Sequence, residues 1–416
     1  MPDSSGSPGL DILRRQLWAA TEAAGSSRLV PGRPGRTGEP DEGWETRERY
    51  WAVPSLARLR LLVPAGDPHV TAAALDGYRR LRPSRERAVR RALGVAARAG
   101  LPPGAARVDL QVRRGAHPEL PLTVIAGALD DETLVAAIGV RPGPNGKPTL
   151  QLLDGEGRHR GYAKLGWNAH TDAYVATETS VLTELEGGGS GMRVPRALAA
   201  GTVAGHPWVV TEPLPEGARA LRGRDDTVTS TELMALTPVV RRDTPAGTQQ
   251  LGGVLARLRG LDGAGPTDLV DTVASLARSV AAVELELPVV ARWHGDLTPW
   301  NCARDEAGGL WCWDWETCEP DALAGLDALH WALSVRRERA GGIAGVALAD
   351  CVADARHHLR AAGVGARADG AVAGAYALTV AERALTLAAR SGWERAWISP
   401  AEVSRVVDEG RRLLGP

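Results

Sequence analysis

The order of elements between Thr133 and Leu214 constrains the fold more than any other feature of the sequence. Short apolar segments alternate there with turns rich in Gly and Pro, a pattern typical of antiparallel strands. The expected strands cover residues 133–140, 148–153, 162–167, 193–201 and 206–214. One helix, expected from about Asp172 to Glu186, separates the third strand from the fourth, and the glycine-rich residues 187–191 end it. The segment therefore predicts a small antiparallel sheet with one helix.

The sequence after Pro215 is mainly helical in composition. One stretch differs, because short apolar strands flank polar residues in VARWHGDLTPWN and GLWCWDWE. Together with the preceding sheet, this pattern predicts an α+β protein with two lobes. Residues 132–214 form the expected sheet lobe, and residues 215–416 form the larger, mainly helical lobe.

The first 131 residues contain two expected segments. Residues 1–45 are interpreted as a flexible leader, because the Gly-, Pro-, Ser- and Arg-rich stretch from Gly25 to Gly43 cannot bury enough apolar surface to order itself. A short amphipathic helix could form within this leader, through Leu10, Leu13, Leu17 and Trp18. Residues 46–131 are expected to form an N-terminal extension with short strands and an arginine-rich helix that begins after Pro83.

Charge and composition exclude several classes of protein. The chain has 416 residues with 49 basic and 50 acidic side chains, so its net charge of -1 gives no general attraction for nucleic acid or anionic lipid. No apolar run approaches the roughly 18–20 residues that would span a bilayer, and the N-terminus does not resemble a signal peptide. We therefore expect a cytoplasmic protein without nucleic-acid or membrane partners. Its four cysteines lack paired CxxC spacing and are interpreted as reduced, buried thiols.

Rare residue types draw attention to two places in the sequence. Phe is absent, only Lys147 and Lys164 are lysines, and only Asn145, Asn168 and Asn301 are asparagines. Since arginine supplies almost all of the positive charge, a retained lysine suggests a place where a compact ammonium is required. Lys164 falls on the third expected strand, and Asn301 falls in the most distinctive motif of the chain.

That motif is His294-Gly295-Asp296-Leu297-Thr298-Pro299-Trp300-Asn301, followed thirteen residues later by Asp314 in the sequence WDWE. Phosphoryl transfer from a nucleotide requires a carboxylate that orients and deprotonates the accepting hydroxyl, together with hard oxygen ligands for Mg²⁺. Asp296 fits the first role. Asn301 and Asp314 fit the second, because amide and carboxylate oxygens suit Mg²⁺.

HGDLTPWN followed by WDWE resembles the catalytic and metal-binding motifs of the aminoglycoside phosphotransferase family, also called the phosphotransferase enzyme family, which has the protein-kinase fold. The resemblance implies a two-lobed kinase-like fold preceded by an N-terminal extension. It implies that Asp296 is the catalytic base, that His294 supports the loop, and that Asn301 and Asp314 bind magnesium. Glu316 matches a further acidic position of the family that helps to organise the metal site.

The resemblance also implies a nucleotide site in the sheet lobe. Lys164 would contact the α- and β-phosphates and would be held by Glu178, with Glu184 as the alternate. The strand that ends in Glu212 and Leu214 resembles the hinge, whose backbone would bind the adenine or guanine edge. Lys147 could reach a phosphate or could be a solvated turn lysine. Its turn, residues 141–147, lacks the GxGxxG pattern of protein kinases, and Arg141 and Pro148 exclude a Walker A site.

We therefore expect an enzyme that uses ATP or GTP with Mg²⁺ to phosphorylate a hydroxyl of a small molecule such as a sugar or an aminoglycoside-like acceptor. A kinase acting on peptides or proteins is an alternative, as is a kinase-fold binding or scaffold protein. The acceptor, the choice between ATP and GTP and the oligomeric state stay open. His330, His357 and His358 are interpreted as surface or helix-packing residues. Most tryptophans near the motif are interpreted as core, with one or two candidates for a substrate pocket.

Overall fold

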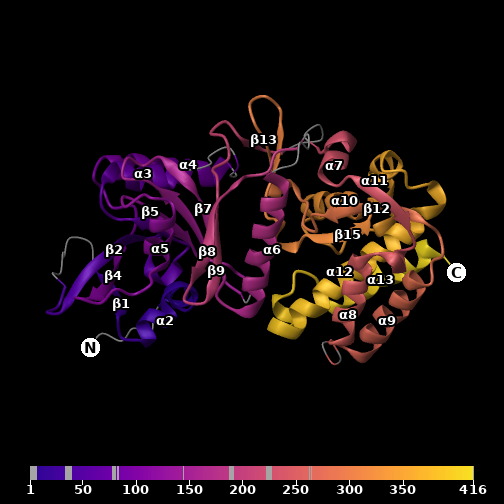
Figure 1. Ribbon diagram of the computed structural model, residues 1–416, viewed down its shortest axis with the longest axis horizontal. Helices are drawn as coiled ribbons and strands as arrows, with labels where there is room; N and C mark the ends of the chain where they lie inside the picture. Colours follow the sequence, from indigo (N-terminus) through magenta and orange to yellow (C-terminus); the bar gives the residue numbers. More distant parts are fainter. Residues whose placement is uncertain are drawn as a thin grey trace. The chain divides into compact units, whose positions relative to one another are not determined.

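The computed structural model describes residues 7–32, 40–76, 81, 84–143, 145–186, 192–221, 227–261, 263 and 265–415. The chain divides into two compact units (Figure 1). The first, which we call the sheet unit, consists of Met1–Gly187 and Pro195–Ala218; the second, the helical unit, consists of Gly188–Val194 and Arg219–Pro416. The expected α+β class is confirmed, since one unit is built on a large antiparallel sheet and the other is mainly helical.

The sheet unit contains a nine-stranded antiparallel sheet with the order β1-β4-β2-β3-β5-β6-β7-β9-β8. The strands are β1 (Ser27–Gly32), β2 (Trp44–Val53), β3 (Leu61–Pro64), β4 (Ala106–Arg113), β5 (Val135–Gly139), β6 (Thr149–Leu153), β7 (His159–Leu165), β8 (Ala197–Val203) and β9 (His206–Thr211). The five strands expected between residues 133 and 214 are all present. The end of the expected helix at residues 187–191 lies outside the described residues.

Helices cover both faces of this sheet, because neighbouring strand residues enter different clusters of buried side chains. Leu62 packs with the N-terminal helices, whereas Val63 packs with α3 and α4. Ile138 and Ala137 divide in the same way. The helical elements are α1 (Pro8–Leu13), the π-helix η1 (Arg14–Trp18), α2 (Ala19–Ala23), η2 (Leu56–Arg58), α3 (Pro68–Asp76), α4 (Ser84–Arg98), α5 (Pro121–Ala128) and α6 (Ala169–Glu186).

The expectation of a flexible leader over residues 1–45 is wrong for residues 7–32 and 40–45. Leu13 and Trp18 are buried in the sheet unit, so the apolar stripe of this segment packs on the sheet. Ser27–Gly32 forms β1 despite its composition, because it pairs with β4 through backbone hydrogen bonds that do not depend on side-chain type. The boundary expected near residue 131 is wrong as well, since β3 pairs with β5 and joins both segments in one sheet. Residues 33–39 and the expected helix start at Pro83 lie outside the described residues.

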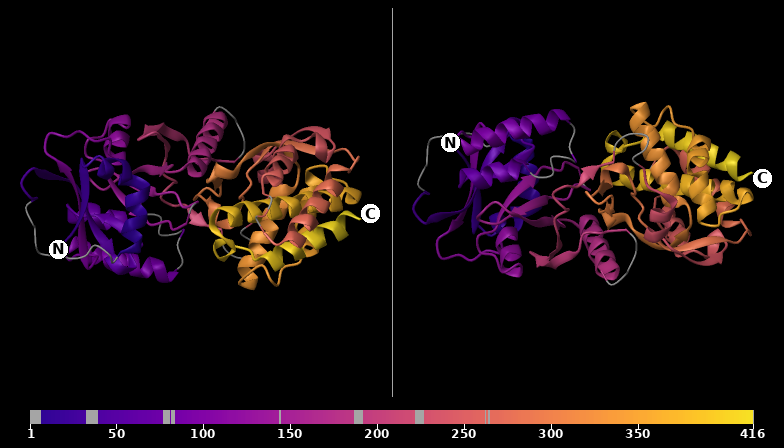
Figure 2. Two further views of the ribbon diagram at one scale, coloured as in Figure 1. Left: turned by 90° about the horizontal axis from the view of Figure 1, so that it is seen from below. Right: turned by 90° about the horizontal axis from the view of Figure 1, so that it is seen from above.

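The helical unit is built around the long helix α12, which contacts α8, α9, α10, α11 and α13. In both views of Figure 2 these helices lie together. The helices are α7 (Ser230–Leu236), α8 (Gln249–Arg259), α9 (Thr267–Ala281), α10 (Leu326–Ala340), α11 (Leu348–Ala361), α12 (Asp369–Ser391) and α13 (Pro400–Leu414), with the short 3₁₀ turns η4 (Pro245–Gly247), η5 (Pro299–Asn301), η6 (Trp315–Thr317), η7 (Ala366–Ala368) and η8 (Trp393–Arg395). None of the helices in the described part of the chain has the length and apolarity needed to cross a membrane.

Two three-stranded sheets in the helical unit carry the loops with the motif residues. Their orders are β10-β13-β14 and β11-β12-β15. The strands are β10 (Arg219–Ala220), β11 (Val239–Asp243), β12 (Leu287–Trp293), β13 (Cys302–Arg304), β14 (Leu310–Cys312) and β15 (Glu319–Leu323). Strand β11 was not expected from the sequence. All four cysteines are buried free thiols, as the sequence predicts.

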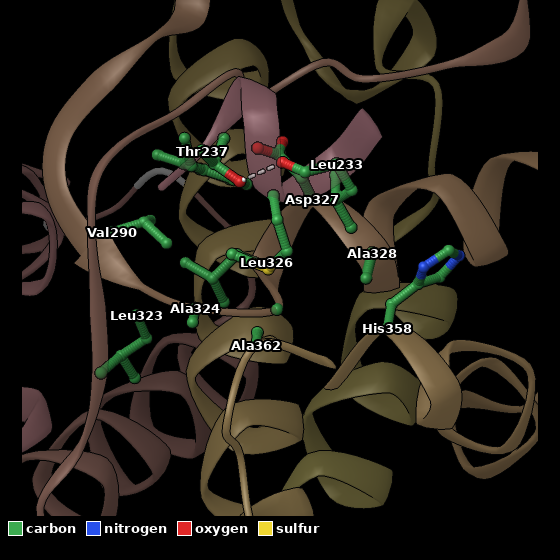
Figure 3. A pocket seen from close by; sticks show the side chains of 13 residues that line it. Leu233, Thr237, Val290, Leu323, Ala324, Leu326, Asp327, Ala328, His358 and Ala362 are labelled. Carbon is green, nitrogen blue, oxygen red and sulfur yellow. Dashed lines mark hydrogen bonds between the residues drawn. The ribbon is translucent and has the colours of Figure 1, made fainter. Parts of the chain in front are cut away.

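The helical unit contains a pocket lined by residues of α7, β12, α10 and α11, among others (Figure 3). Its walls are mostly apolar, and its polar groups are already bonded: Thr237 donates a hydrogen bond to the Leu233 carbonyl, and His358 Nδ1 lies 2.8 Å from Ser230 Oγ. Asp296, Asn301 and Asp314 are not among its lining residues. We therefore treat the pocket as a packing feature of the helical unit.

Candidate active site

In the sheet unit, Lys164 forms an ion pair with Glu178. Lys164 lies on β7 between Ala163 and Leu165, whose side chains enter the core on one face of the sheet, so the ammonium emerges on the opposite face. There its Nζ donates hydrogen bonds of 2.7 and 2.8 Å to the two carboxylate oxygens of Glu178, which projects from α6. Glu178 is only 2% exposed, and Lys164 is 15% exposed. The alternate, Glu184, instead accepts a hydrogen bond from Ser180 on the same helix.

The turn that contains Lys147 is held in place by other parts of the sheet unit. Gln16, on η1, donates hydrogen bonds from Nε2 to the carbonyls of Arg141 (3.2 Å) and Gly146 (2.7 Å). Trp167 donates a further one to Gly146. Lys147 is buried, with its ammonium 4.9 Å from the ring centre of Tyr174, so the reading of a solvated turn lysine is wrong.

The two expected hinge residues follow β9. The carboxylate of Glu212 accepts hydrogen bonds from the backbone N–H and Nε of Arg196, at 3.0 and 2.9 Å. The Glu212 N–H donates to the Arg196 carbonyl. Glu212 is thus bonded to the chain that leads into β8, and its backbone N–H is not available to a nucleotide base. Leu214 lies partly buried, three residues beyond the end of β9.

In the helical unit, the loop after β12 is fixed by buried polar contacts. His294 is fully buried, its Nε2 lies 3.1 Å from the Trp313 carbonyl, and its Nδ1 accepts a hydrogen bond from the Asp296 N–H. Burial lowers the pKa of His294, which keeps the ring neutral and able to accept that bond. Gly295 has φ 84°, and a Cβ there would collide with the Thr317 carbonyl oxygen. This position therefore requires glycine.

Asp327 holds the same loop from α10, and its role was not predicted from the sequence. Its buried carboxylate accepts hydrogen bonds from the backbone N–H groups of His294 (2.8 Å) and Gly295 (3.1 Å). Burial raises its pKa, and the two N–H donors oppose that rise. Asp327 thus fixes the backbone on which Asp296 is carried.

The carboxylate of Asp296 is oriented by two side chains. Asn301 Nδ2 donates a 2.8 Å hydrogen bond to Oδ2, and His330 Nε2 lies 3.2 Å from Oδ1. His330 Nδ1 in turn lies 3.0 Å from the hydroxyl of the buried Tyr376. The interpretation of His330 as a helix-packing residue holds for its contact with Tyr376 of α12, but the sequence did not predict its contact with Asp296. In the sequence, the feature that could have pointed to His330 is its position one helical turn after Asp327. The Asp296 side chain is still 40% exposed and can meet a substrate hydroxyl.

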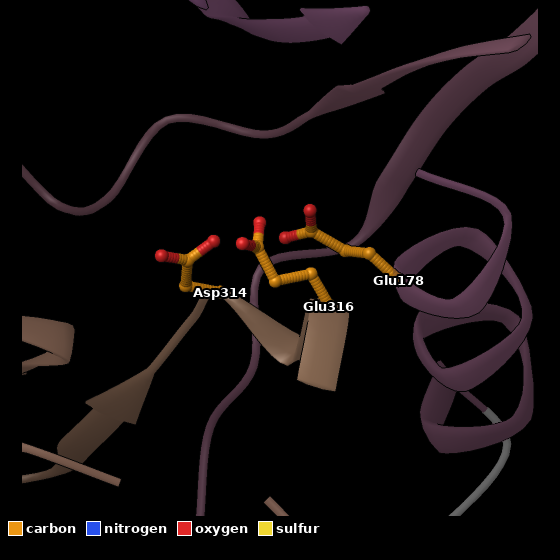
Figure 4. Close-up of side chains that lie close together, drawn as sticks. All are labelled: Glu178, Asp314 and Glu316. Atoms are coloured by element: carbon orange, nitrogen blue, oxygen red, sulfur yellow. The ribbon is translucent and has the colours of Figure 1, made fainter. Parts of the chain in front are cut away.

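The oxygen atoms expected to bind magnesium are arranged by the β13–β14 hairpin. Cys302 pairs with Cys312, and the Trp313 N–H donates to the Asn301 carbonyl, so Asn301 lies beside the residue that precedes Asp314. Asp314 follows in a left-handed backbone conformation, with φ 72° and ψ 52°. The carboxylates of Asp314 and Glu316 project from the start of η6 (Figure 4), with oxygen atoms within 4.8 Å of each other.

The donor set of these residues fits a magnesium ion. Both hydrogen bonds from Asn301 Nδ2 go to Asp296, one to its carbonyl and one to its carboxylate. No described residue donates a hydrogen bond to Asn301 Oδ1, so this amide oxygen can serve as a ligand. Together with the Asp314 and Glu316 carboxylates, it gives an all-oxygen set of the kind that Mg²⁺ prefers.

Comparisons with known proteins give matches to solved structures only. No protein-family model matches the chain, and no curated protein matches it. The chain is similar to a Haemophilus somnus 129PT protein assigned as a fructosamine-3-kinase (11% identity, 71% of this chain and 96% of that chain, TM-score 0.44). It is also similar to the choline kinase LicA from Streptococcus pneumoniae (14% identity, 64% of this chain and 89% of that chain, TM-score 0.38). A third similar structure is an aminoglycoside 2'-phosphotransferase-IIIa in its GDP complex (12% identity, 70% of this chain and 94% of that chain, TM-score 0.38). All three names are those of small-molecule kinases, but similarities at this level do not assign a function.

Proposed function

We propose that the protein is a magnesium-dependent phosphotransferase that moves the γ-phosphate of ATP or GTP to a hydroxyl of a small molecule. The observation that carries this proposal is the arrangement around Asp296. Its half-exposed carboxylate is oriented on one side by Asn301 and on the other by His330, and the Asn301 and Asp314 oxygens are supplied by the same loop and hairpin. An oriented carboxylate beside hard oxygen ligands is what phosphoryl transfer to a hydroxyl requires.

Each residue has a distinct role in the proposed reaction. Asp296 would accept a hydrogen bond from the acceptor hydroxyl and take its proton as the new O–P bond forms, while the bond between the γ-phosphorus and the β–γ bridging oxygen breaks and ADP or GDP leaves. Asn301 and Asp314 would hold Mg²⁺, with Glu316 beside them, and the bound ion would neutralise charge on the phosphates. In the sheet unit, Lys164 would contact the α- and β-phosphates, and Glu178 keeps its ammonium in position.

The residues that do not meet substrate support this chemistry by holding the loop. The neutral imidazole of His294 and the carboxylate of Asp327 accept hydrogen bonds from three consecutive backbone N–H groups, at residues 294 to 296.

The proposed reaction uses cytoplasmic nucleotides, which fits the cytoplasmic location expected from the sequence. The buried free cysteines are compatible with a reducing compartment.

The proposal is tested by Asp296→Asn, which keeps the shape of the side chain and removes its basicity. Phosphate transfer to a panel of sugars, sugar acids and amino sugars, and background nucleotide hydrolysis, should fall by about 10²- to 10⁴-fold. Nucleotide affinity, measured by calorimetry with Mg²⁺, should stay within about threefold of the wild type. Asp350→Asn, an exposed carboxylate on α11, is the matched control and should leave the rate unchanged. Equal rates for Asp296→Asn and the wild type would refute the proposal.

A further inference from the structure

A guanidinium lies close to the rings of two exposed tryptophans in the helical unit. The Arg337 guanidinium carbon is 5.5 Å from the ring centre of Trp300 and 5.1 Å from that of Trp397. Trp300 is 45% exposed and Trp397 is 39% exposed, whereas Trp293 and Trp315 of the same region are buried. Two solvent-facing indole rings in contact with one cation form a surface that the packing of the protein does not require.

Arg337 has no acidic partner in the described part of the chain. Its neighbour Arg336 pairs with Asp350 and Asp354. Arg383, the other arginine near the catalytic loop, donates to the carbonyls of Gly295 and Thr317. No described residue accepts a hydrogen bond from the Arg337 side chain or forms an ion pair with it. Its fork of five N–H donors is therefore held by the two rings but left without acceptors.

The position of Arg337 relates it to the catalytic base. Trp300 belongs to the same loop as Asp296 and follows it by four residues. Arg337 follows His330 by seven residues on α10, so both side chains lie on the same face of the helix, about 10 Å apart along its axis. His330 contacts Asp296 directly. Both charges also act on the buried Tyr376. Burial raises the pKa of Tyr376, the positive charge of Arg337 lowers it, and the negative charge of Asp296 raises it.

We infer that the hydroxyl acceptor of this enzyme carries an anionic group, a carboxylate or a phosphate, which Arg337 binds beside Trp300 and Trp397. The inference rests on the proposed function and names its class of substrate. A planar guanidinium binds such oxyanions with paired hydrogen bonds, and the flanking indoles keep it in one orientation. An amino-sugar or a quaternary ammonium would need the ring faces that Arg337 already occupies and would be repelled by its charge.

The test compares acceptors that differ only in charge. Gluconate and glucose 6-phosphate present a carboxylate and a phosphate, glucose is neutral, and glucosamine is cationic. With the wild type, kcat/KM for at least one anionic acceptor should exceed that for glucose by about tenfold or more. Arg337→Gln should lower kcat/KM for that acceptor by about 10- to 100-fold, mainly through KM, and should lower kcat/KM for glucose by much less. Arg339→Gln, an exposed arginine in the last turn of the same helix, is the matched control and should have no effect.

Direct binding separates failure of this inference from failure of the proposed function. Ligand-observed NMR with gluconate and glucose 6-phosphate should detect binding to the wild type and to Asp296→Asn, and should lose it with Arg337→Gln. Such binding without any phosphate transfer would support the anion site and overturn the proposed reaction. A preference for glucosamine would overturn the inference, as would anion binding that survives Arg337→Gln, or no binding of either anion at millimolar concentration.

Discussion

Removal of one partner of the Lys164–Glu178 pair should destabilise the sheet unit strongly. Glu178→Gln keeps the size of the side chain and removes the carboxylate that accepts two hydrogen bonds from the Lys164 ammonium, which is only 15% exposed. Breaking a buried pair in this way costs about 3–5 kcal/mol. Because Lys164 keeps some contact with solvent, we expect the lower end, about 3 kcal/mol. For a unit of this size that corresponds to a fall of about 6–12 °C in its melting temperature.

The assay is thermal unfolding followed by calorimetry, with the double variant Lys164→Met, Glu178→Leu beside both single variants. The double variant removes both charges, so it should lose far less stability than Glu178→Gln, about 1 kcal/mol. Glu45→Gln breaks the exposed pair with Arg47 on β2 and should cost less than about 1 kcal/mol. If Glu178→Gln were as stable as the wild type, or the double variant were as unstable as Glu178→Gln, the reasoning from burial would be refuted.

Three further predictions follow from the site and the core. Asp314→Asn should abolish the magnesium dependence of nucleotide affinity measured by calorimetry, and an unchanged dependence would contradict its metal role. His330→Phe should lower kcat by about tenfold with nucleotide affinity unchanged, and His330→Gln should restore part of it, because the contact with Asp296 orients the base. Burial raises the pKa of Glu48 on β2 from 4.5 to about 7, so the folded state should lose about 2 kcal/mol of stability between pH 5.5 and pH 8. Glu48→Gln should remove this loss, and urea unfolding at pH 5.5 and pH 8 measures it.

The sheet between residues 133 and 214 could be predicted because its information is local. The strands are short apolar segments, and connections of five to nine residues join neighbours that also pair with each other, such as β5 with β6 and β6 with β7. The motif loop was predictable for the same reason. Asp296 and Asn301 lie five residues apart, and one hairpin places Asp314 beside them.

Contacts distant in sequence could not be predicted in this way. The pairing of Ser27 with Val112 joins strands 85 residues apart, and no pattern within β1 identifies β4 as its partner. Two residues of α10, Asp327 and His330, contact the catalytic loop, and Tyr376 of α12 contacts His330. Their roles therefore depend on how the helices pack. Arg337 looks in the sequence like any other helix arginine, because its distinctive feature is the absence of an acidic partner in the described structure.

The pairing of β3 with β5 through Leu61 and Leu62 has a consequence for dissection of the chain. A shortened protein that began near Thr133 would carry β5 as an unprotected border strand, with its outward N–H and C=O groups ready to recruit other molecules. It would also lack Gln16, whose amide secures the turn before Lys147. Such a fragment should therefore precipitate rather than fold. The first 130 residues are in that sense an integral half of the sheet, not an appendage that could be gained or lost independently.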